Sequence, residues 1–358
     1  MQNNLPLDRA VSVRPGEALD TQSLESYLLA QLPGTHGPLV VEQFPSGYSN
    51  LTYLLRLGEQ ELVLRRPPFG AAVKSGHDMT REYRMLAGLR TVYPKVPQPL
   101  LYCEDDAVLG APFYVMERIN GVILRNRLPE GIGPEEMGAI CHALVDTLVE
   151  LHGLDYERAG LTELGHPEGY VARQVSGWTQ RYHKARTDDL PELEAAAAWL
   201  AAYLPREQRP TLLHNDYRYD NVVLDPATLS HIIAILDWEM ATLGDPLMDI
   251  GTTLGYWAEP GDPAELRQFG ISSLPGNLDR QQVAERYAQQ SGRDISDILF
   301  YYVYGLFKVA VIAQQIYYRY RQGHTQDPRF AGLIHIVRAT GQLAARAIEK
   351  KRIHHLFE

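Results

Sequence analysis

Residues 211–239 read TLLHNDYRYDNVVLDPATLSHIIAILDWE and carry the most informative polar residues of the chain. Two carboxylates, Asp216 and Asp237, lie on either side of Asn221, and all three stand at the ends of apolar runs. Charge held near apolar surroundings is costly unless it is paired or bound to a metal. The stretch therefore predicts a hairpin that holds two acids and an amide for chemistry.

The spacing of these residues indicates which chemistry. His214, Asp216 and Asn221 fit the pattern H-x-D-x-x-x-x-N, which occurs in phosphotransferase catalytic loops. Asp216 would orient an attacking hydroxyl and accept its proton, and Asn221 would offer a neutral oxygen to Mg²⁺. Asp237 would supply the carboxylate, because Mg²⁺ prefers a few hard oxygen ligands together with water and phosphate. We therefore expect Asp216 to be catalytic, and Asn221 and Asp237 to bind the metal.

Three segments carry a resemblance to a known family. HNDYRYDN, LDWE and GDPLMDIG are similar to the aminoglycoside phosphotransferase and choline kinase-like family, and most similar to phosphotransferase domains related to those fused to acyl-CoA dehydrogenases. The resemblance spans roughly residues 37–345 and implies an α+β, two-lobed, protein kinase-like fold. We expect an N-terminal extension with a short helix at 1–36, a small antiparallel-sheet N-lobe at 37–118 and a larger, mainly helical C-lobe at 119–358.

Hydrophobic periodicity predicts the same organisation. Helical spacing is present in 18–32 and 78–91, and β-rich runs over 39–68 are broken at Pro45–Gly47 and at Gly58–Gln60. With the strand-like segments PLLYCED and PFYVMER, these predict a five-stranded sheet with one inserted helix. Further helices are expected over the ranges 134–152, 191–204 and 280–347, interrupted by the β-type run HIIAIL.

The resemblance also implies a nucleotide site for ATP or GTP with Mg²⁺. Arg65 ends the third predicted strand, where kinases place a Lys on the phosphates, and Glu82 on the next helix could pair with it. Arg can clamp phosphate oxygens bidentately. The hinge would hold the base near Glu117 and Arg118, and the loop SGYSN would contact phosphate through Ser49 and Asn50. This loop has only Gly47, and Glu239 stands where kinases have the glycine of D-F-G.

Arg218, in the same stretch, has two readings. Arg218 could stabilise charge on the transferred phosphate, or it could form an ion pair with Asp220 or Glu239. We expect His214 to brace the backbone. Asp245 and Asp249 are expected to anchor the backbone of the catalytic loop.

Composition limits the class of protein. Asp plus Glu outnumber Lys plus Arg by 44 to 34, which argues against a general nucleic-acid surface. The N-terminus shows no signal-peptide pattern and no run approaches a membrane span, so we expect a cytoplasmic protein with no membrane partner. Cys103 and Cys141 lack a metal-ligand spacing and are expected to be reduced core residues.

The leading hypothesis is an ATP- and Mg²⁺-dependent kinase of a small hydroxylated metabolite, with hydroxyacyl-CoA or a related hydroxy acid as acceptor and a functional link to acyl-CoA metabolism. An aminoglycoside-type antibiotic kinase is the first alternative. A nucleotide-binding module without transfer activity is the second. A metal hydrolase built from His214, Asp216 and Asp237, which predicts zinc or two metals, is the third.

Overall fold

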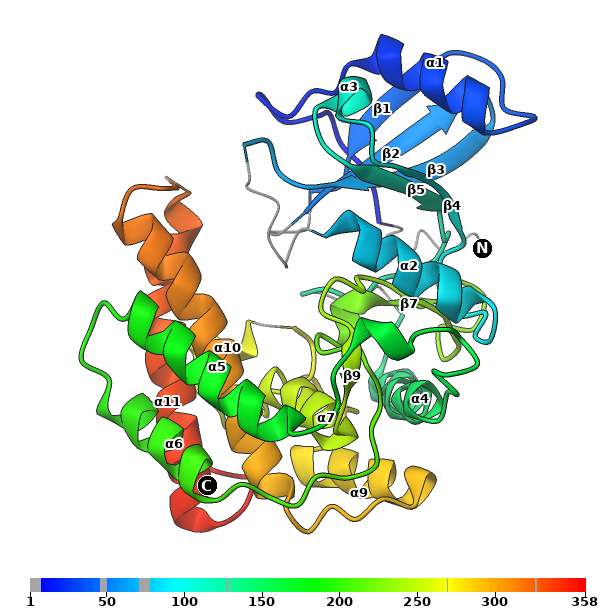
Figure 1. Cartoon of the computed structure of the whole chain (residues 1–358). Helices are drawn as coiled ribbons and strands as arrows, with labels where there is room; N and C mark the ends of the chain where they lie inside the picture. The colour runs from blue at the N-terminus through cyan, green and yellow to red at the C-terminus, as the bar shows by residue number, and fades with distance from the viewer. Residues whose placement is uncertain are drawn as a thin grey trace. The chain divides into compact units, whose positions relative to one another are not determined.

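The structure is a computed structural model that describes residues 8–45, 50–70, 78–126, 128–129, 131–268, 270–325 and 327–358. It divides into two compact units (Figure 1). Unit 1 comprises Met1–Ile123, Asp155–Leu164 and Val223–Ala241, and unit 2 comprises Leu124–Leu154, Gly165–Val222 and Thr242–Glu358. Both units are discontinuous in sequence, whereas the expected boundaries at 37–118 and 119–358 are contiguous. The predicted α+β class is confirmed.

Unit 1 contains the predicted five-stranded antiparallel sheet. Its strands are β1 (Leu39–Gln43), β2 (Leu51–Leu57), β3 (Gln60–Arg66), β4 (Pro99–Cys103) and β5 (Phe113–Glu117). Their order is β1-β2-β3-β5-β4. Leu57 pairs with Gln60 across a two-residue turn. In this turn Gly58 has a φ of 61°, a value that residues with a side chain rarely adopt. The sheet holds Arg65 near the end of β3, directly opposite Thr52 of β2.

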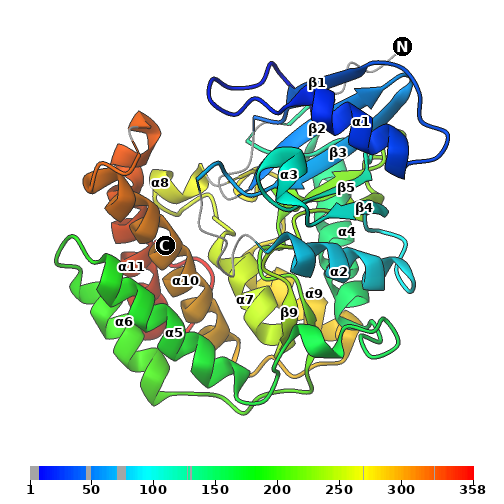
Figure 2. The same cartoon turned by 45° about the horizontal axis from the view of Figure 1, so that its top comes forward.

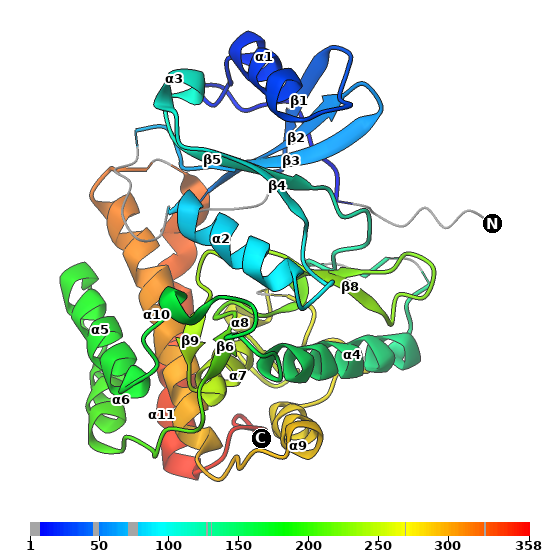
Figure 3. The ribbon, with the colours of Figure 1, turned by 45° about the vertical axis from the view of Figure 1, so that its right-hand side comes forward.

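Helices cover both faces of this sheet (Figures 1 and 3). On one face, α1 (Thr21–Gln31) and the short α3 (Asp106–Leu109) enclose a core that includes Leu24, Leu28 and the sheet residue Leu64. On the other, α2 (Met79–Arg90) packs against β4 and β5. The predicted helices over 18–32 and 78–91 are confirmed, whereas α3 was not predicted, because four residues show no periodicity.

The stretch 211–239 forms parts of two small sheets. β7 (Val222–Leu224) and β8 (Ile232–Ile235) make a hairpin, as predicted. β6 (Thr211–Leu213) pairs instead with β9 (Thr242–Gly244), a strand that was not predicted. Asp216 and Asn221 therefore follow a strand of one sheet and precede a strand of another.

Unit 2 is mainly helical. Its helices are α4 (Pro134–His152), α5 (Tyr170–Ala185), α6 (Pro191–Ala202), α7 (Pro246–Gly255), α8 (Ala264–Arg267), α9 (Arg280–Ser291), α10 (Ile298–Arg321) and α11 (Leu333–Lys350). Short 3₁₀ segments are η2 (Tyr219–Asn221) and η3 (Pro328–Gly332) in this unit, and η1 (Thr162–Leu164) in unit 1. The helices expected within 134–152, 191–204 and 280–347 are confirmed. α5 and α7 were not predicted, although buried residues at helical spacing, such as Val171, Val175 and Trp178, mark α5.

Helix α10 is the central element of unit 2, with α5, α6 and α11 alongside it (Figure 2). Among the described residues it is the one helix whose length and composition suit a membrane span, because an 18-residue window within it has a mean hydropathy of 1.3. The expectation that no segment approaches a span is therefore wrong for α10. Since 83% of that window is buried inside the protein, packing accounts for its apolar composition.

Two glycines bring α10 against α7. A Cβ on Gly305 would lie 1.9 Å from the carbonyl oxygen of Gly251, and a Cβ on Gly251 would lie 2.3 Å from that of Tyr301. Only hydrogen side chains permit this approach of the two backbones. The contact places α7, which carries Asp249, beside the middle of α10, which carries Lys308.

Candidate active site

The catalytic loop of unit 2 folds so that Asn221 returns to Asp216. The 3₁₀ turn η2 brings the Asn221 Nδ2 within 2.8 Å of the Asp216 carbonyl oxygen and 2.9 Å of its Oδ2. Both bonds use the amide nitrogen as donor, so the Asn221 Oδ1 takes part in neither. The spacing H-x-D-x-x-x-x-N therefore brings the Asp216 carboxylate and the Asn221 amide into direct contact, as predicted.

A buried carboxylate on α7 anchors this loop. Asp249 is fully buried, and it accepts hydrogen bonds from the backbone N–H groups of His214 at 2.6 Å and Asn215 at 2.8 Å. The His152 Nε2 lies 3.2 Å from the same carboxylate. Burial alone would raise the pKa of Asp249, but its hydrogen bonds and the charge of His152 keep that pKa below the usual value. Asp249 thus anchors the loop backbone as expected.

Asp245 does not share that role. Its carboxylate accepts hydrogen bonds from the N–H groups of Leu247 and Gln208 and from the Tyr301 hydroxyl, each at 2.9 Å. It caps the N-terminus of α7, so the expectation that it anchors the catalytic loop was wrong. N-caps and loop anchors use the same residue type, and the sequence alone does not separate them.

The backbone just before Asp216 has an unusual conformation. Asn215 has a φ of 65°, in the left-handed region that few side chains other than Asn and Asp adopt. Its side chain bonds the Tyr170 hydroxyl at 3.1 Å, and the backbone N–H of Asp216 donates to the His214 Nδ1 at 3.3 Å. His214 therefore braces the backbone, as expected.

Lys308 is a residue of this site that sequence reasoning missed. Its Nζ donates to the backbone carbonyl of Asn215 at 2.7 Å, from a side chain that is buried in unit 2. The only signal in the sequence is a single charged residue within the apolar run YYVYGLFKVAVIA. Such a residue is rarely buried without a specific partner.

Arg218 lies between two carboxylates. Its Nε is 3.7 Å from the Asp216 Oδ1 and its Nη2 is 3.7 Å from the Asp220 Oδ2, while the guanidinium stands 4.8 Å from the centre of the Tyr256 ring. Burial raises the pKa of Asp220, against the opposing charges of Arg218 and Arg125. The ion pair with Asp220 that was weighed for Arg218 is thus present in unit 2.

Unit 1 holds a second polar group around Arg65. The Arg65 Nε lies 3.3 Å from Glu82, as predicted, and its Nη2 lies 2.9 Å from Asp237 and 3.5 Å from Glu239. Burial disfavours the guanidinium charge, but these three carboxylates raise the pKa of Arg65 well above its usual value. The same burial raises the pKa of Glu82, and Arg65 opposes that shift.

Asp237 and Asn50 complete this group. Asp237 has a φ of 65°, and 31% of its side chain is exposed. The Asn50 Nδ2 donates to the Glu239 Oε2 at 2.8 Å. Glu239, which stands in the place of the D-F-G glycine, therefore links Asn50 to Arg65. Ser49 lies outside the described residues, and its predicted phosphate contact stays a prediction.

The predicted hinge residues have partners in the sheet. The backbone N–H of Glu117 donates to the Gln98 carbonyl at 2.8 Å, and its carboxylate accepts from the Gln98 N–H at 3.2 Å. The Arg118 side chain pairs with Glu61. Because the Glu117 donor is already used, a nucleotide base at the hinge would depend on other backbone groups.

A sequence profile of the phosphotransferase enzyme family, APH, matches residues 40–285, which include both polar groups described above. The chain belongs to this phosphotransferase family. The resemblance inferred from HNDYRYDN, LDWE and GDPLMDIG is confirmed.

Two relatives illustrate what this phosphotransferase is similar to. It is 35% identical to acyl-CoA dehydrogenase family member 11 of Homo sapiens over 93% of its own length and 44% of that protein, so it spans less than half the length of this relative. A crystal structure from Ralstonia eutropha, provisionally assigned as an aminoglycoside phosphotransferase, is 31% identical with a TM-score of 0.80, covering 93% of this chain and 99% of that one.

More distant structures share the fold. The GDP and kanamycin complex of APH(2″)-IIIa is 14% identical with a TM-score of 0.61, covering 89% of this chain and 98% of the other. At that identity the likeness shows the fold alone, which is the predicted kinase-like fold.

Each unit holds one of the two predicted magnesium ligands, and both offer the hard oxygen atoms that Mg²⁺ prefers. Asn221 in unit 2 has an amide oxygen outside its two hydrogen bonds, and Asp237 in unit 1 has a carboxylate bonded to Arg65 through Oδ1. No group of three or more His, Cys, Asp or Glu side chains that could hold a metal occurs among the residues that the structure describes.

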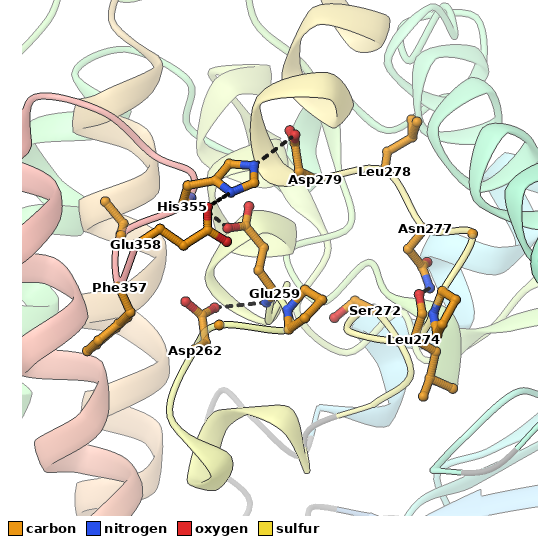
Figure 4. A pocket seen from close by; sticks show the side chains of 15 residues that line it. Glu259, Asp262, Ser272, Leu274, Asn277, Leu278, Asp279, His355, Phe357 and Glu358 are labelled. Carbon is orange, nitrogen blue, oxygen red and sulfur yellow. Dashed lines mark hydrogen bonds and ion pairs between the residues drawn. The ribbon is translucent and has the colours of Figure 1, made fainter.

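A cavity of about 180 Å³ in unit 2 contains none of the predicted site residues. It lies between the segment Glu259–Asp279 and the C-terminal residues His355–Glu358 (Figure 4). Its carboxylates already have partners, since Glu259 and Asp262 bind the buried Arg280, and Glu358 and Asp279 lie beside His355. The acidic side chains that line the cavity are therefore already paired with Arg280 or His355.

Proposed function

We propose that this phosphotransferase moves the γ-phosphate of ATP or GTP, with Mg²⁺, to a hydroxyl of a small metabolite. The observation that carries this proposal is the pair Asp216 and Asn221, held together at 2.9 Å in a loop that Asp249 anchors from behind. Membership of the phosphotransferase family supports it.

The chain supplies distinct groups for each requirement of the reaction. Asp216 would accept the proton of the acceptor hydroxyl. The oxygen of that hydroxyl would then bond to the γ-phosphorus, while the bond from this phosphorus to the leaving nucleoside diphosphate breaks. Arg218, beside Asp216, would stabilise charge on the transferred phosphate. Arg65, tied to Glu82 and Asp237, would position the nucleotide phosphates, and Mg²⁺ would neutralise charge on the phosphates when bound.

For the acceptor, we propose a hydroxyacyl-CoA or a related hydroxy acid. The support is similarity to a relative named for acyl-CoA dehydrogenase, at 35% identity over most of this chain. An aminoglycoside is the second candidate, favoured by the 31% identical structure that is provisionally assigned as an aminoglycoside phosphotransferase.

The test is a panel of acceptors. ADP release from ATP and Mg²⁺ would be measured with 3-hydroxybutyryl-CoA, free hydroxy acids and kanamycin. Loss of a positioned general base lowers the rate by about 10²–10⁴-fold, so Asp216→Asn should abolish any acceptor-dependent signal. The same variant should keep its nucleotide affinity, because Asp216 acts on the acceptor.

The controls separate the alternatives. ATP binding by calorimetry without ADP release for any acceptor would favour a nucleotide-binding module. Normal turnover by Asp216→Asn would show that the proposed base is wrong. Activity that needs zinc and no nucleotide would favour the hydrolase reading of His214, Asp216 and Asp237.

A further inference from the structure

The backbone of His214 and Asn215, just before Asp216, is bound by two opposite charges within unit 2. The carboxylate of Asp249 accepts the N–H groups of His214 and Asn215, and the ammonium of Lys308 donates to the carbonyl of Asn215 at 2.7 Å. The contacts come from α7 and α10, which meet at Gly251 and Gly305. An anion therefore binds two successive N–H groups of this backbone segment, and a cation binds the carbonyl group that follows them.

This arrangement costs stability, which argues that it serves another purpose. Lys308 is 1% exposed, and its surroundings include the Trp178 ring, whose centre is 5.8 Å from the Nζ. A lysine buried with one hydrogen bond loses more hydration than that bond returns. Asn215 also keeps a left-handed φ of 65°, which most residues avoid.

We propose that Lys308 is a positioning residue for phosphoryl transfer, which fixes the Asn215 carbonyl and so sets the direction of the Asp216 carboxylate. This inference rests on the proposed function, in which Asp216 is the base. The left-handed turn at Asn215 changes the direction of the chain immediately before Asp216. A rotation of the peptide between Asn215 and Asp216 would therefore displace the Asp216 carboxylate. A displacement of about 1 Å at a catalytic group can cost roughly 10²-fold in rate.

The charge state of Lys308 gives the proposal a signature in pH. Burial lowers the pKa of Lys308 to about 8, against the opposing effects of Asp216 and Asp249, while Arg181 on α5 adds to the lowering. Below this pKa the bond to Asn215 is charge-assisted, and above it the bond is neutral and weaker. The rate of transfer should therefore fall as the pH rises through about 8.

Two variants and one matched control test the proposal. Lys308→Met removes the donor and the charge at similar volume, and Lys308→Gln keeps a neutral donor. The control is Gln314→Met, which removes another buried polar group from α10, one that bonds the Ala185 carbonyl and the Thr187 hydroxyl at 2.8 Å each. Single-turnover rates with ATP and Mg²⁺ would be measured between pH 6 and 10, using the acceptor that releases most ADP in the panel.

Lys308→Met should slow the single-turnover rate by about 10–100-fold with nucleotide KM within about threefold of the parent. The decrease in rate near pH 8 should be absent from Lys308→Met and Lys308→Gln. The Tm of Lys308→Met should equal or exceed that of the parent, since a costly buried charge is gone. Gln314→Met should keep the parent rate and its pH dependence, with a lower Tm.

The outcomes distinguish this inference from the proposed function. A parent protein that transfers phosphate, together with a Lys308→Met variant of unchanged rate, would overturn the inference alone. Equal slowing by Lys308→Met and Gln314→Met would also overturn it. The loss of any buried polar group on α10 would then be enough to lower the single-turnover rate. A parent protein with no transfer to any acceptor would refute the proposed function itself.

Discussion

Arg65 belongs both to the buried ion cluster of unit 1 and to the proposed nucleotide site. Its guanidinium is shared by Glu82, Asp237 and Glu239, and the Glu82 side chain is only 2% exposed. Removing one partner of a buried pair leaves an uncompensated charge, whereas removing both is far less costly. The same guanidinium can therefore hold Asp237 and, in the proposed function, reach nucleotide phosphate.

Arg65→Met should lower the free energy of unfolding by about 3–5 kcal/mol, because Glu82 remains buried without its cation. Adding Glu82→Gln should recover part of that loss. Urea denaturation of the single and double variants measures both effects.

A matched control is Arg56→Met on the neighbouring strand β2. Arg56 pairs with Glu61 at 3.0 Å but its side chain is 41% exposed, so solvent screens the pair. If Arg65→Met cost no more than Arg56→Met, the buried ion cluster would not stabilise unit 1.

At the scale of elements, the contact between α7 and α10 positions the catalytic loop of unit 2. Asp249 lies two residues before Gly251, and Lys308 lies three residues after Gly305. Because the two glycines let the helix backbones touch, both charged side chains reach the same short segment of backbone, Asp249 at its N–H groups and Lys308 at the Asn215 carbonyl.

Gly305→Ala should therefore destabilise unit 2 and slow transfer. The added Cβ would lie 1.9 Å from the Gly251 carbonyl oxygen, so the helices must separate. Overpacking of this kind typically costs about 1–3 kcal/mol, measured by thermal or urea unfolding.

Gly332→Ala is the matched control for Gly305→Ala. Gly332 has a φ of −80° and no atom within 4 Å of its added Cβ. Its substitution should leave the free energy of unfolding almost unchanged. Equal stability of the two variants would show that the close approach of α7 and α10 is not required.

At the scale of the whole molecule, each unit is assembled from separated segments. In unit 1, the Arg81 side chain on α2 donates to the carbonyls of Leu164 and Ala241, and the Ile235 N–H donates to the Lys95 carbonyl at 2.8 Å. The hairpin that leads to Asp237 is thus part of the same unit as the five-stranded sheet, although more than 100 residues separate them in sequence.

A polypeptide of residues 1–123 should therefore not fold cooperatively. It lacks the segments 155–164 and 223–241, so the partners of Arg81 and Lys95 are missing and part of the core is exposed. Its amide NMR spectrum should show narrow dispersion, with the full chain as reference. A cooperative urea transition with well-dispersed amide signals in this fragment would contradict the assignment of those segments to unit 1.

Local patterns in the sequence were sufficient for much of this protein. The five strands of unit 1 follow from β-rich runs and turn residues such as Gly58, and α2 and α4 follow from apolar spacing. The motif H-x-D-x-x-x-x-N predicted that Asp216 and Asn221 would act together, because five residues of loop and 3₁₀ turn bring them within hydrogen-bonding distance. The Arg65–Glu82 pair was predicted from the order of elements that the family resemblance implies.

The residues that complete these groups from distant segments are seen only in the folded chain. The sequence predicts the fold class, the family and most of the polar residues around Asp216 and Asp237, because local spacing and motif carry that information. It did not determine the pairing of β6 with β9, the different roles of Asp245 and Asp249, or the bond from Lys308 to Asn215. Those features depend on contacts between segments tens of residues apart, and no local pattern records such distances.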